Sequence, residues 1–318
     1  MIWGKTDSAD FYINHNCDLR CNHCFVGNNL NSKFEIPLET AKGIINECSN
    51  HGINSITLLG GEPCLHSRII EIVEYIDSKN IKVRIVSNGQ KSYLRFIKSI
   101  NSELKKKIHV CFSIEGSRKE IHDHIRGSNS FEKLINSIHL TLEYGVSMSG
   151  ILSVSSDNFH DIFNVIELCE KYQMKYLNIH YVTNRGFAKK EKIIPVLDWV
   201  ELCREIRFMN HTIKIRIEET FVQSGNKINC GVIEKENIII DPKGRLFGCT
   251  MFLDMFEMQT ANFENNTFVY NKSGINESTM CKKNCNGCPA IEIINNSLVL
   301  EASKLGYSID CIFNKTTY

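Results

Sequence analysis

The chain has 318 residues, of which 42% are hydrophobic and 23% charged, with a formal net charge of +1. This near-neutral balance offers no electrostatic footprint for nucleic acid or an anionic membrane. No apolar stretch approaches the roughly 18–20 residues that a membrane-spanning helix needs. The first ten residues also lack the basic-then-apolar pattern of a signal peptide. These features predict a cytoplasmic protein with no nucleic-acid or membrane partner, folded as one large domain or as one domain with a smaller appendage.

Short apolar runs alternate with helix-period segments from the start of the chain. Helical patterns separate the runs, and the first begins near Pro37, a residue suited to a first helical turn. Strands that alternate with helices indicate a parallel α/β sheet. Polar or glycine-bearing segments follow several strand ends, where barrel enzymes place their chemistry. We therefore expect a partial (β/α)6 TIM-like barrel. Its six predicted strands lie at residues 11–13, 55–59, 82–86, 108–114, 148–154 and 176–181.

The alternation of strand and helix patterns ends near residue 215. Residues 238–241 and 245–249 flank a Pro-Lys-Gly turn and predict a β-hairpin, and the remaining sequence is rich in loops and clustered cysteines. We therefore expect two domains. The barrel would cover residues 1–214, and a smaller cysteine-rich domain that holds auxiliary clusters would cover residues 215–318.

Fourteen cysteines are the most informative feature of the composition. Disulfide frameworks belong mostly to much shorter secreted chains, so this content indicates metal binding. Cys17, Cys21 and Cys24 lie within eight residues, directly after the first predicted strand. Three thiolates at this spacing can hold an iron–sulfur cubane and leave one iron without a protein ligand. On spacing alone, His23 could instead complete a four-ligand zinc site.

This CxxxCxxC triad resembles the cluster motif of the radical S-adenosylmethionine (SAM) superfamily. The four residues at the end of the second strand are similar to the family's GGEP motif, which holds the methionine amino group of SAM. Two glycines allow close approach to a ligand, and a carboxylate pairs with an ammonium. His23 stands where the family usually has an aromatic residue, and an imidazole can still pack against adenine. The GGEP residues are Gly60, Gly61, Glu62 and Pro63.

Two later segments extend the resemblance. Ser87 and Asn88, after the third strand, resemble the segment that contacts the ribose of SAM, although Asn-Gly is also a common turn. Ser113 in the fourth strand, followed by Arg126, is similar to the pattern of the subgroup that modifies peptides. There the serine and the arginine contact the SAM carboxylate, and a guanidinium fork suits a carboxylate.

The resemblance implies a specific mechanism and specific cofactors. A [4Fe–4S] cluster would bind SAM at its open iron. One electron from the reduced cluster would then yield a 5′-deoxyadenosyl radical, which abstracts hydrogen from an unactivated carbon of the substrate. The electron would come from an external one-electron reductant similar to flavodoxin or ferredoxin.

The C-terminal cysteines resemble the SPASM and twitch extensions of this superfamily, which carry auxiliary [4Fe–4S] clusters. The matching features are Gly244, which precedes a cysteine by five positions, and a Cys-Pro ending. The full SPASM pattern has at least seven cysteines and two clusters, whereas this chain offers six, so at least one auxiliary cluster is expected and a second stays open. CxxC spacing also fits a zinc ribbon. The candidate ligands are Cys230, Cys249, Cys281, Cys285, Cys288 and Cys311.

The remaining cysteines are expected to be buried thiols. Cys48, Cys169 and Cys203 lie in helical patterns. Cys64 directly follows the GGEP motif, and Cys111 shares a strand face with the serine two residues later. For these last two, the alternative is a hydrogen donor to a substrate radical, as in the epimerases of the superfamily.

The resemblance favours modification of a ribosomally made peptide by a cross-link, a thioether or an epimerisation. Many peptide enzymes of this group carry a recognition domain before the triad. Only sixteen residues precede Cys17, so no such domain is expected in this chain, and this counts against a peptide substrate unless a separate leader-binding protein delivers it. The alternative is a twitch-type dehydrogenase or epimerase of a carbohydrate-like small molecule. A third class, a non-catalytic zinc-binding scaffold, would leave Glu62 and Arg126 unexplained.

Overall fold

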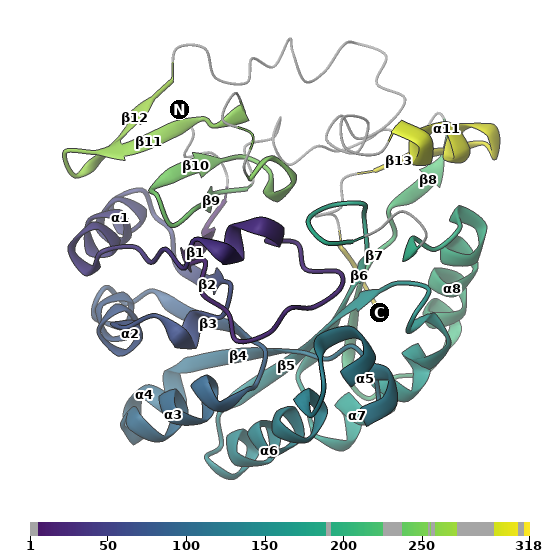
Figure 1. The fold of residues 1–318 in the computed structure, drawn as a ribbon, viewed down its shortest axis with the longest axis horizontal. Helices are drawn as coiled ribbons and strands as arrows, with labels where there is room; N and C mark the ends of the chain where they lie inside the picture. The colour runs from purple at the N-terminus through teal and green to yellow at the C-terminus, as the bar shows by residue number, and fades with distance from the viewer. Residues whose placement is uncertain are drawn as a thin grey trace.

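The computed structural model describes residues 6–188, 192–224, 237–253, 255, 258–271, 296–310 and 315–318. Its centre is a curved sheet in which seven parallel strands are paired in chain order (Figure 1). This arrangement confirms the predicted α/β partial barrel and all six predicted strands, and it adds a seventh parallel strand. The strands are β1 (Ser8–Asn14), β2 (Ser55–Gly60), β3 (Lys82–Ser87), β4 (Ile108–Ser113), β5 (Ser147–Val154), β6 (Tyr176–Tyr181) and β7 (Lys214–Glu218).

Helices cover the outer face of this sheet (Figure 1). The first of them shows why, because its buried residues Ala41, Ile44, Ile45 and Cys48 follow the spacing of one helix face. The α-helices are α1 (Leu38–Asn50), α2 (Ile69–Ser78), α3 (Lys91–Ser99), α4 (Ser102–Lys107), α5 (Lys119–Arg126), α6 (Ser130–Glu143), α7 (Ile162–Lys171), α8 (Val196–Phe208) and α11 (Asn296–Lys304). The short 3-10 helices are η1 (Gly27–Asn31), η2 (Pro63–Leu65), η3 (Phe159–Asp161) and η5 (Thr250–Phe252).

Further strands extend the same sheet at both edges. β9 (Ile239–Ile240) pairs in parallel with β1, and β10 (Arg245–Phe247), β11 (Ala261–Glu264) and β12 (Thr267–Tyr270) continue from it antiparallel. At the other edge, β14 (Lys315–Thr317) pairs antiparallel with β7. A separate two-stranded sheet joins β8 (Phe221–Gln223) and β13 (Tyr307–Ile309). The domain boundary at residue 215 stays a prediction.

The predicted hairpin is present as β9 and β10. Its turn is stabilised by the Asp241 carboxylate, whose Oδ1 accepts hydrogen bonds from the backbone N–H groups of Lys243 (3.0 Å) and Arg245 (2.9 Å). Gly244 has a φ of +76°, a conformation that glycine adopts without the strain of a side chain.

The two faces of the barrel strands differ in chemistry. On β3, Val83 and Ile85 are buried in the core, whereas Arg84 and Val86 face inward and line a cavity. The same alternation places Asn178 and His180 of β6 on the inner face. The barrel interior is therefore not a closed apolar core, and it encloses a cavity of about 490 Å³.

Cys48, Cys169 and Cys203 are buried free thiols, as expected. Within the described ranges, no helix has the length and apolar character needed to cross a bilayer.

Candidate active site

The barrel cavity brings together almost all the predicted site residues of the first domain. They come from the loop after β1 and from the ends of β2, β3 and β4, with one contribution from α5. Pro63 is the exception, because it is buried in η2 and does not line the cavity. The predicted residues that line the cavity are Cys17, Cys21, His23, Cys24, Gly60, Gly61, Glu62, Ser87, Asn88, Ser113 and Arg126.

Backbone hydrogen bonds anchor the loop that carries the cysteine triad. The N–H of Asn22 donates to the carbonyl of Ile125 in α5 (3.0 Å), and the N–H of Phe187 donates to the carbonyl of Cys24 (2.9 Å). Helix α5 and the loop that contains Phe187 therefore fix the position of the triad loop at the cavity.

The triad thiols are partly or fully buried, and burial affects the protonation of two of them, Cys17 and Cys21. Burial raises the pKa of Cys17 to about 12 and also raises that of Cys21, against the opposing charge of Arg126. Without metal, both thiols therefore stay protonated at neutral pH, and a bound metal would displace their protons.

The donor set fits a cluster held by three thiolates. His23, the fourth ligand that a zinc site would need, lies with its Nε2 3.3 Å from Oε1 of Glu115. In the described part of the chain, no three or more His, Cys, Asp or Glu side chains are arranged to hold a single metal ion. A cubane is larger than one ion and accommodates three thiols that line a common cavity.

Gly60 and Gly61 allow β2 to end against the triad loop. A Cβ at Gly60 would lie 2.4 Å from Oδ1 of Asn14, and one at Gly61 would lie 2.4 Å from the carbonyl oxygen of Asn16. The N–H of Glu62 donates to that same Asn16 carbonyl (2.7 Å). The two glycines thus allow two segments of the chain to approach closely, and their close approach to a ligand stays a prediction.

The Glu62 carboxylate is buried and held by three donors. It accepts hydrogen bonds from Ser87 Oγ (3.0 Å), the N–H of Asn88 (2.7 Å) and the N–H of Cys64 (3.1 Å). Burial raises its pKa to about 7, although these hydrogen bonds oppose the rise. An ammonium group in the cavity would favour the ionised form, because an opposite charge stabilises a carboxylate.

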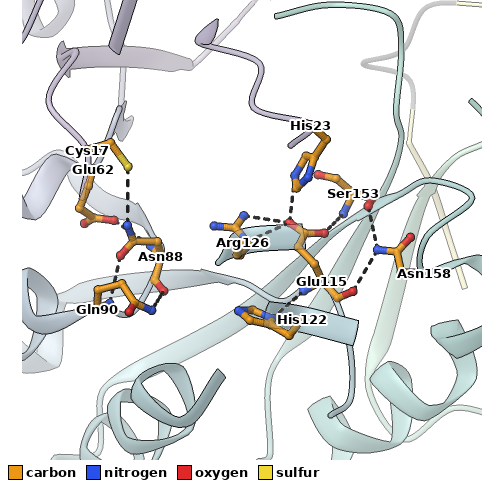
Figure 2. Close-up of polar contacts among 10 residues, drawn as sticks. All are labelled: Cys17, His23, Glu62, Asn88, Gln90, Glu115, His122, Arg126, Ser153 and Asn158. Carbon is orange, nitrogen blue, oxygen red and sulfur yellow. Dashed lines mark hydrogen bonds and ion pairs between the residues drawn. The ribbon is translucent and has the colours of Figure 1, made fainter. Parts of the chain in front are cut away.

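Asn88 connects the end of β3 to the triad loop (Figure 2). Its Nδ2 donates to Oδ1 of Asp18 (2.8 Å) and lies 3.8 Å from Sγ of Cys17. The residue therefore touches both the Glu62 carboxylate, through its backbone, and the first cysteine, through its side chain.

Glu115 is a central residue that our sequence reasoning missed. Its side chain is completely buried directly after β4, and Oε1 accepts from Nη2 (2.8 Å) and Nε (3.3 Å) of Arg126 (Figure 2). Oε2 accepts from the N–H of Ser153 (2.9 Å). Burial alone would raise the pKa of Glu115, but His23 and Arg126 together hold it well below its usual range. The available signal was its position two residues after Ser113, on the same alternating face.

The deeper part of the cavity is lined by polar residues of the inner strand faces. Cys111 lines this region, with its Sγ 3.6 Å from Oη of Tyr176, whereas Cys64 does not line the cavity. Our sequence reasoning also missed two arginines here, Arg84 and Arg216. Strand alternation indicates that they share a face with other polar residues, but it does not show that several strands meet around one cavity.

Of the predicted auxiliary-cluster ligands, Cys249 is described and buried, between β10 and η5. The next two residues, Thr250 and Met251, line the barrel cavity, so this segment forms part of its wall. The other candidates lie outside the described residues, and their roles stay predictions. They are Cys230, Cys281, Cys285, Cys288 and Cys311.

Sequence comparison relates the chain to known proteins. A family model described as "Radical SAM superfamily" matches residues 11–169, half of the chain. The antilisterial bacteriocin subtilosin biosynthesis protein AlbA of Bacillus subtilis is 24% identical over 270 residues, which cover 83% of this chain and 59% of AlbA. The AdoMet-dependent heme synthase of Nitratidesulfovibrio vulgaris is 20% identical over 72% of this chain and 63% of its own length. The chain thus spans less than two thirds of either relative.

Solved structures share the fold. Streptococcus suis SuiB bound to precursor peptide SuiA superposes with a TM-score of 0.68 at 18% identity, covering 82% of this chain and 63% of SuiB. The structure of anSMEcpe with bound AdoMet and Cp18Cys peptide gives a TM-score of 0.61 at 18% identity, covering 81% of this chain and 77% of that one.

Proposed function

Because the chain belongs to the radical SAM superfamily and is a radical SAM enzyme, we propose that Cys17, Cys21 and Cys24 hold the [4Fe–4S] cluster that binds SAM. When bound, the cluster supplies one-electron cleavage of SAM, and this leads to removal of hydrogen from an unactivated substrate carbon. The position of the three cysteines on one wall of the cavity supports this assignment.

The chain's own residues would bind and orient SAM. Glu62 pairs with the amino group, and the donors Ser87 Oγ and Asn88 N–H hold its carboxylate in one orientation. Ser113 and Arg126 face the SAM carboxylate, since both line the cavity. Glu115 is a positioning residue, because it fixes the guanidinium of Arg126 through two hydrogen bonds. His23, which also contacts Glu115, lies within the triad loop and would pack against the adenine of SAM.

The substrate that we propose is a ribosomally made peptide, which would be cross-linked, joined through a thioether or epimerised. The observation that carries this proposal is the similarity to a bacteriocin biosynthesis protein over 83% of the chain. The structural match to SuiB bound to a precursor peptide supports it at the level of the fold. A flavodoxin- or ferredoxin-like protein would supply the electron, and a separate protein would present the leader peptide.

A second candidate is a small-molecule substrate. The match to a heme synthase over 72% of the chain favours it. A dehydrogenase or epimerase of a carbohydrate-like molecule belongs to this class. In either case we propose at least one auxiliary [4Fe–4S] cluster, with Cys249 and Cys288 as ligands.

The test is anaerobic reconstitution with iron and sulfide, followed by incubation with SAM, a reductant and any short precursor peptide found to be encoded beside the gene. We expect formation of 5′-deoxyadenosine and a modified peptide, measured by mass spectrometry and, for epimerisation, by deuterium incorporation from D2O. A colourless zinc protein without 5′-deoxyadenosine would overturn the proposal. Active SAM cleavage with no change in the peptide would instead favour the second candidate, a small-molecule substrate.

A further inference from the structure

Two arginines lie deep in the barrel cavity, below the residues assigned to SAM. Arg84 precedes Ser87 by three positions on β3, so it lies about 10 Å further from the strand end at about 3.3 Å per residue. Arg216 enters the same cavity from β7. Both side chains are partly buried. Neither forms an ion pair with a carboxylate in the part of the chain that the structure describes.

The two guanidinium groups approach a common set of side chains. The guanidinium carbon of Arg216 lies 4.0 Å from the centre of the Tyr176 ring, and this ring stacks on His109 at 5.3 Å. Burial, together with the charges of Lys175, Arg84 and Arg216, lowers the pKa of His109 to about 4. Arg84 on β3 and Arg216 on β7 therefore both lie close enough to His109 for their charges to affect it, although three other strands separate β3 from β7 in the sheet.

A partly buried guanidinium without a counter-ion is unfavourable, and an anionic ligand relieves the cost. The guanidinium fork suits a carboxylate in particular. Glu218, which also lines the cavity, is already paired with His180 at 2.5 Å. Because Asp10 and Glu218 add negative charge to the same cavity, a carboxylate with one charge suits the site better than a phosphate dianion.

A second observation points to a peptide. Oδ1 of Asn178 is buried and accepts no hydrogen bond from the described residues, and Asn178 lines the same cavity. An amide N–H beside the carboxylate would satisfy this acceptor. Peptides present the two groups close together, either at an acidic residue or at the C-terminus.

We infer that Arg84 and Arg216 form a carboxylate-binding subsite on the cavity floor, which anchors an acidic side chain or the C-terminus of the substrate. This inference rests on the proposed peptide-modifying function. The subsite would hold the substrate at one end, so that the carbon to be modified lies between the arginines and SAM.

Three matched probes test the subsite by calorimetry on the reconstituted enzyme with SAM and without reductant. N-acetylglutamate α-amide carries only a side-chain carboxylate, N-acetylglutamine carries only a C-terminal carboxylate, and N-acetylglutamine amide carries neither. We expect one charged probe to bind at least about tenfold more tightly than the neutral probe. Which one binds identifies the source of the carboxylate. Equal binding of all three, or tighter binding of inorganic phosphate than of either charged probe, would overturn the inference.

Variants connect the binding to the two arginines. Arg84→Gln and Arg216→Gln should each weaken the preferred probe about tenfold. Lys82→Gln and Lys214→Gln are matched controls, because each removes a positive charge from the exposed start of the same strand. Arg84→Lys should recover part of the binding, which separates a lost charge from a damaged fold. If Arg84→Gln and Arg216→Gln bound the probe with the same affinity as the controls Lys82→Gln and Lys214→Gln, the assignment would be contradicted.

Failure of the subsite and failure of the proposed function are distinguishable. The probes are measured without radical chemistry, whereas 5′-deoxyadenosine formation is measured separately. Normal 5′-deoxyadenosine formation with no preference for charged probes would overturn the subsite alone. Charge-selective binding without any 5′-deoxyadenosine would overturn the function alone.

Discussion

The guanidinium of Arg126 and the carboxylate of Glu115 form a buried ion pair, with Nη2 2.8 Å from Oε1. The carboxylate is completely buried, and its remaining partners are His23 and the N–H of Ser153. The residue that we assign to the SAM carboxylate therefore also neutralises a charge inside the protein.

Replacing Arg126 with alanine should for this reason affect both binding and stability. We expect SAM affinity to fall about tenfold to a hundredfold through loss of a charge-assisted contact. The free energy of unfolding should fall by about 3–5 kcal/mol, because Glu115 is left buried without its main partner. SAM titration and urea unfolding measure the two effects. Arg118→Ala is the control, since Arg118 is an exposed residue at the start of the same helix. Unchanged SAM affinity would remove Arg126 from the site.

His109 predicts a pH dependence of stability. Its pKa is about 4 in the folded protein, mainly because of burial, against an ordinary value of about 6.5. The unfolded chain therefore binds more protons between these values, and the stabilisation is complete above pH 6.5 and lost as pH falls toward 4. Between pH 7 and pH 5 this loss should be about 1–2 kcal/mol. Urea unfolding of wild type and His109→Gln at the two pH values checks this, and equal losses in both would show that another group is responsible.

The triple variant Cys17→Ala, Cys21→Ala, Cys24→Ala should form no 5′-deoxyadenosine, because it lacks all three ligands of the proposed catalytic cluster. It should keep the iron of the C-terminal cysteines. With one auxiliary cluster, the wild type should contain about eight irons and the variant about four. With two auxiliary clusters, the variant should keep about eight. Wild-type rates of SAM cleavage in the variant would refute the assignment.

Substitution of Cys311 with alanine gives a sharper test of the second auxiliary cluster. A one-cluster arrangement would use Cys230, Cys249, Cys285 and Cys288, whereas Cys311 would be a ligand only in a two-cluster arrangement. If Cys311 is a ligand, both iron content and turnover should fall, since its loss exposes an iron to solvent. If only one auxiliary cluster exists, the substitution should change neither beyond local packing. Cys203→Ala is a matched control, because this buried thiol lies in helix α8, apart from the predicted clusters.

Gly61→Ala should displace the triad loop. The added Cβ would lie 2.4 Å from the backbone carbonyl of Asn16, one residue before the first cysteine, and backbone cannot move aside as a flexible side chain does. We expect loss of catalytic-site iron together with reduced stability. Gly52→Ala serves as the comparison, because a Cβ there meets nothing within 4 Å, although its φ of +81° adds strain. Full iron occupancy in Gly61→Ala would show that the loop tolerates the shift.

The sequence was sufficient to predict the strands whose outer faces are apolar. The seventh parallel strand was not predicted, because residues 214–218 contain only two apolar residues among charged ones. The cysteine triad and the GGEP segment could be identified because motif spacing is local. Glu115 could not be assigned a role in the same way, since its importance depends on burial beside Arg126, eleven positions later. Arg84 and Arg216 lie 132 residues apart in sequence, and only closure of the curved sheet brings both into one cavity.

β1 pairs with two strands, of which β2 is close to it in the sequence and β9 is far from it. Asp10 pairs with Thr57 on β2 on one side and with Ile239 on β9 on the other. Closing a long loop costs more chain entropy than closing a short one, and distant pairings slow folding. We therefore expect the β1–β2 pair to form early during refolding and the ribbon of β9 to β12 to dock late. The cavity would then gain the wall formed by Thr250 and Met251 only in a final assembly step, and a newly folded barrel would pass through an intermediate whose interior is still open to solvent on that side.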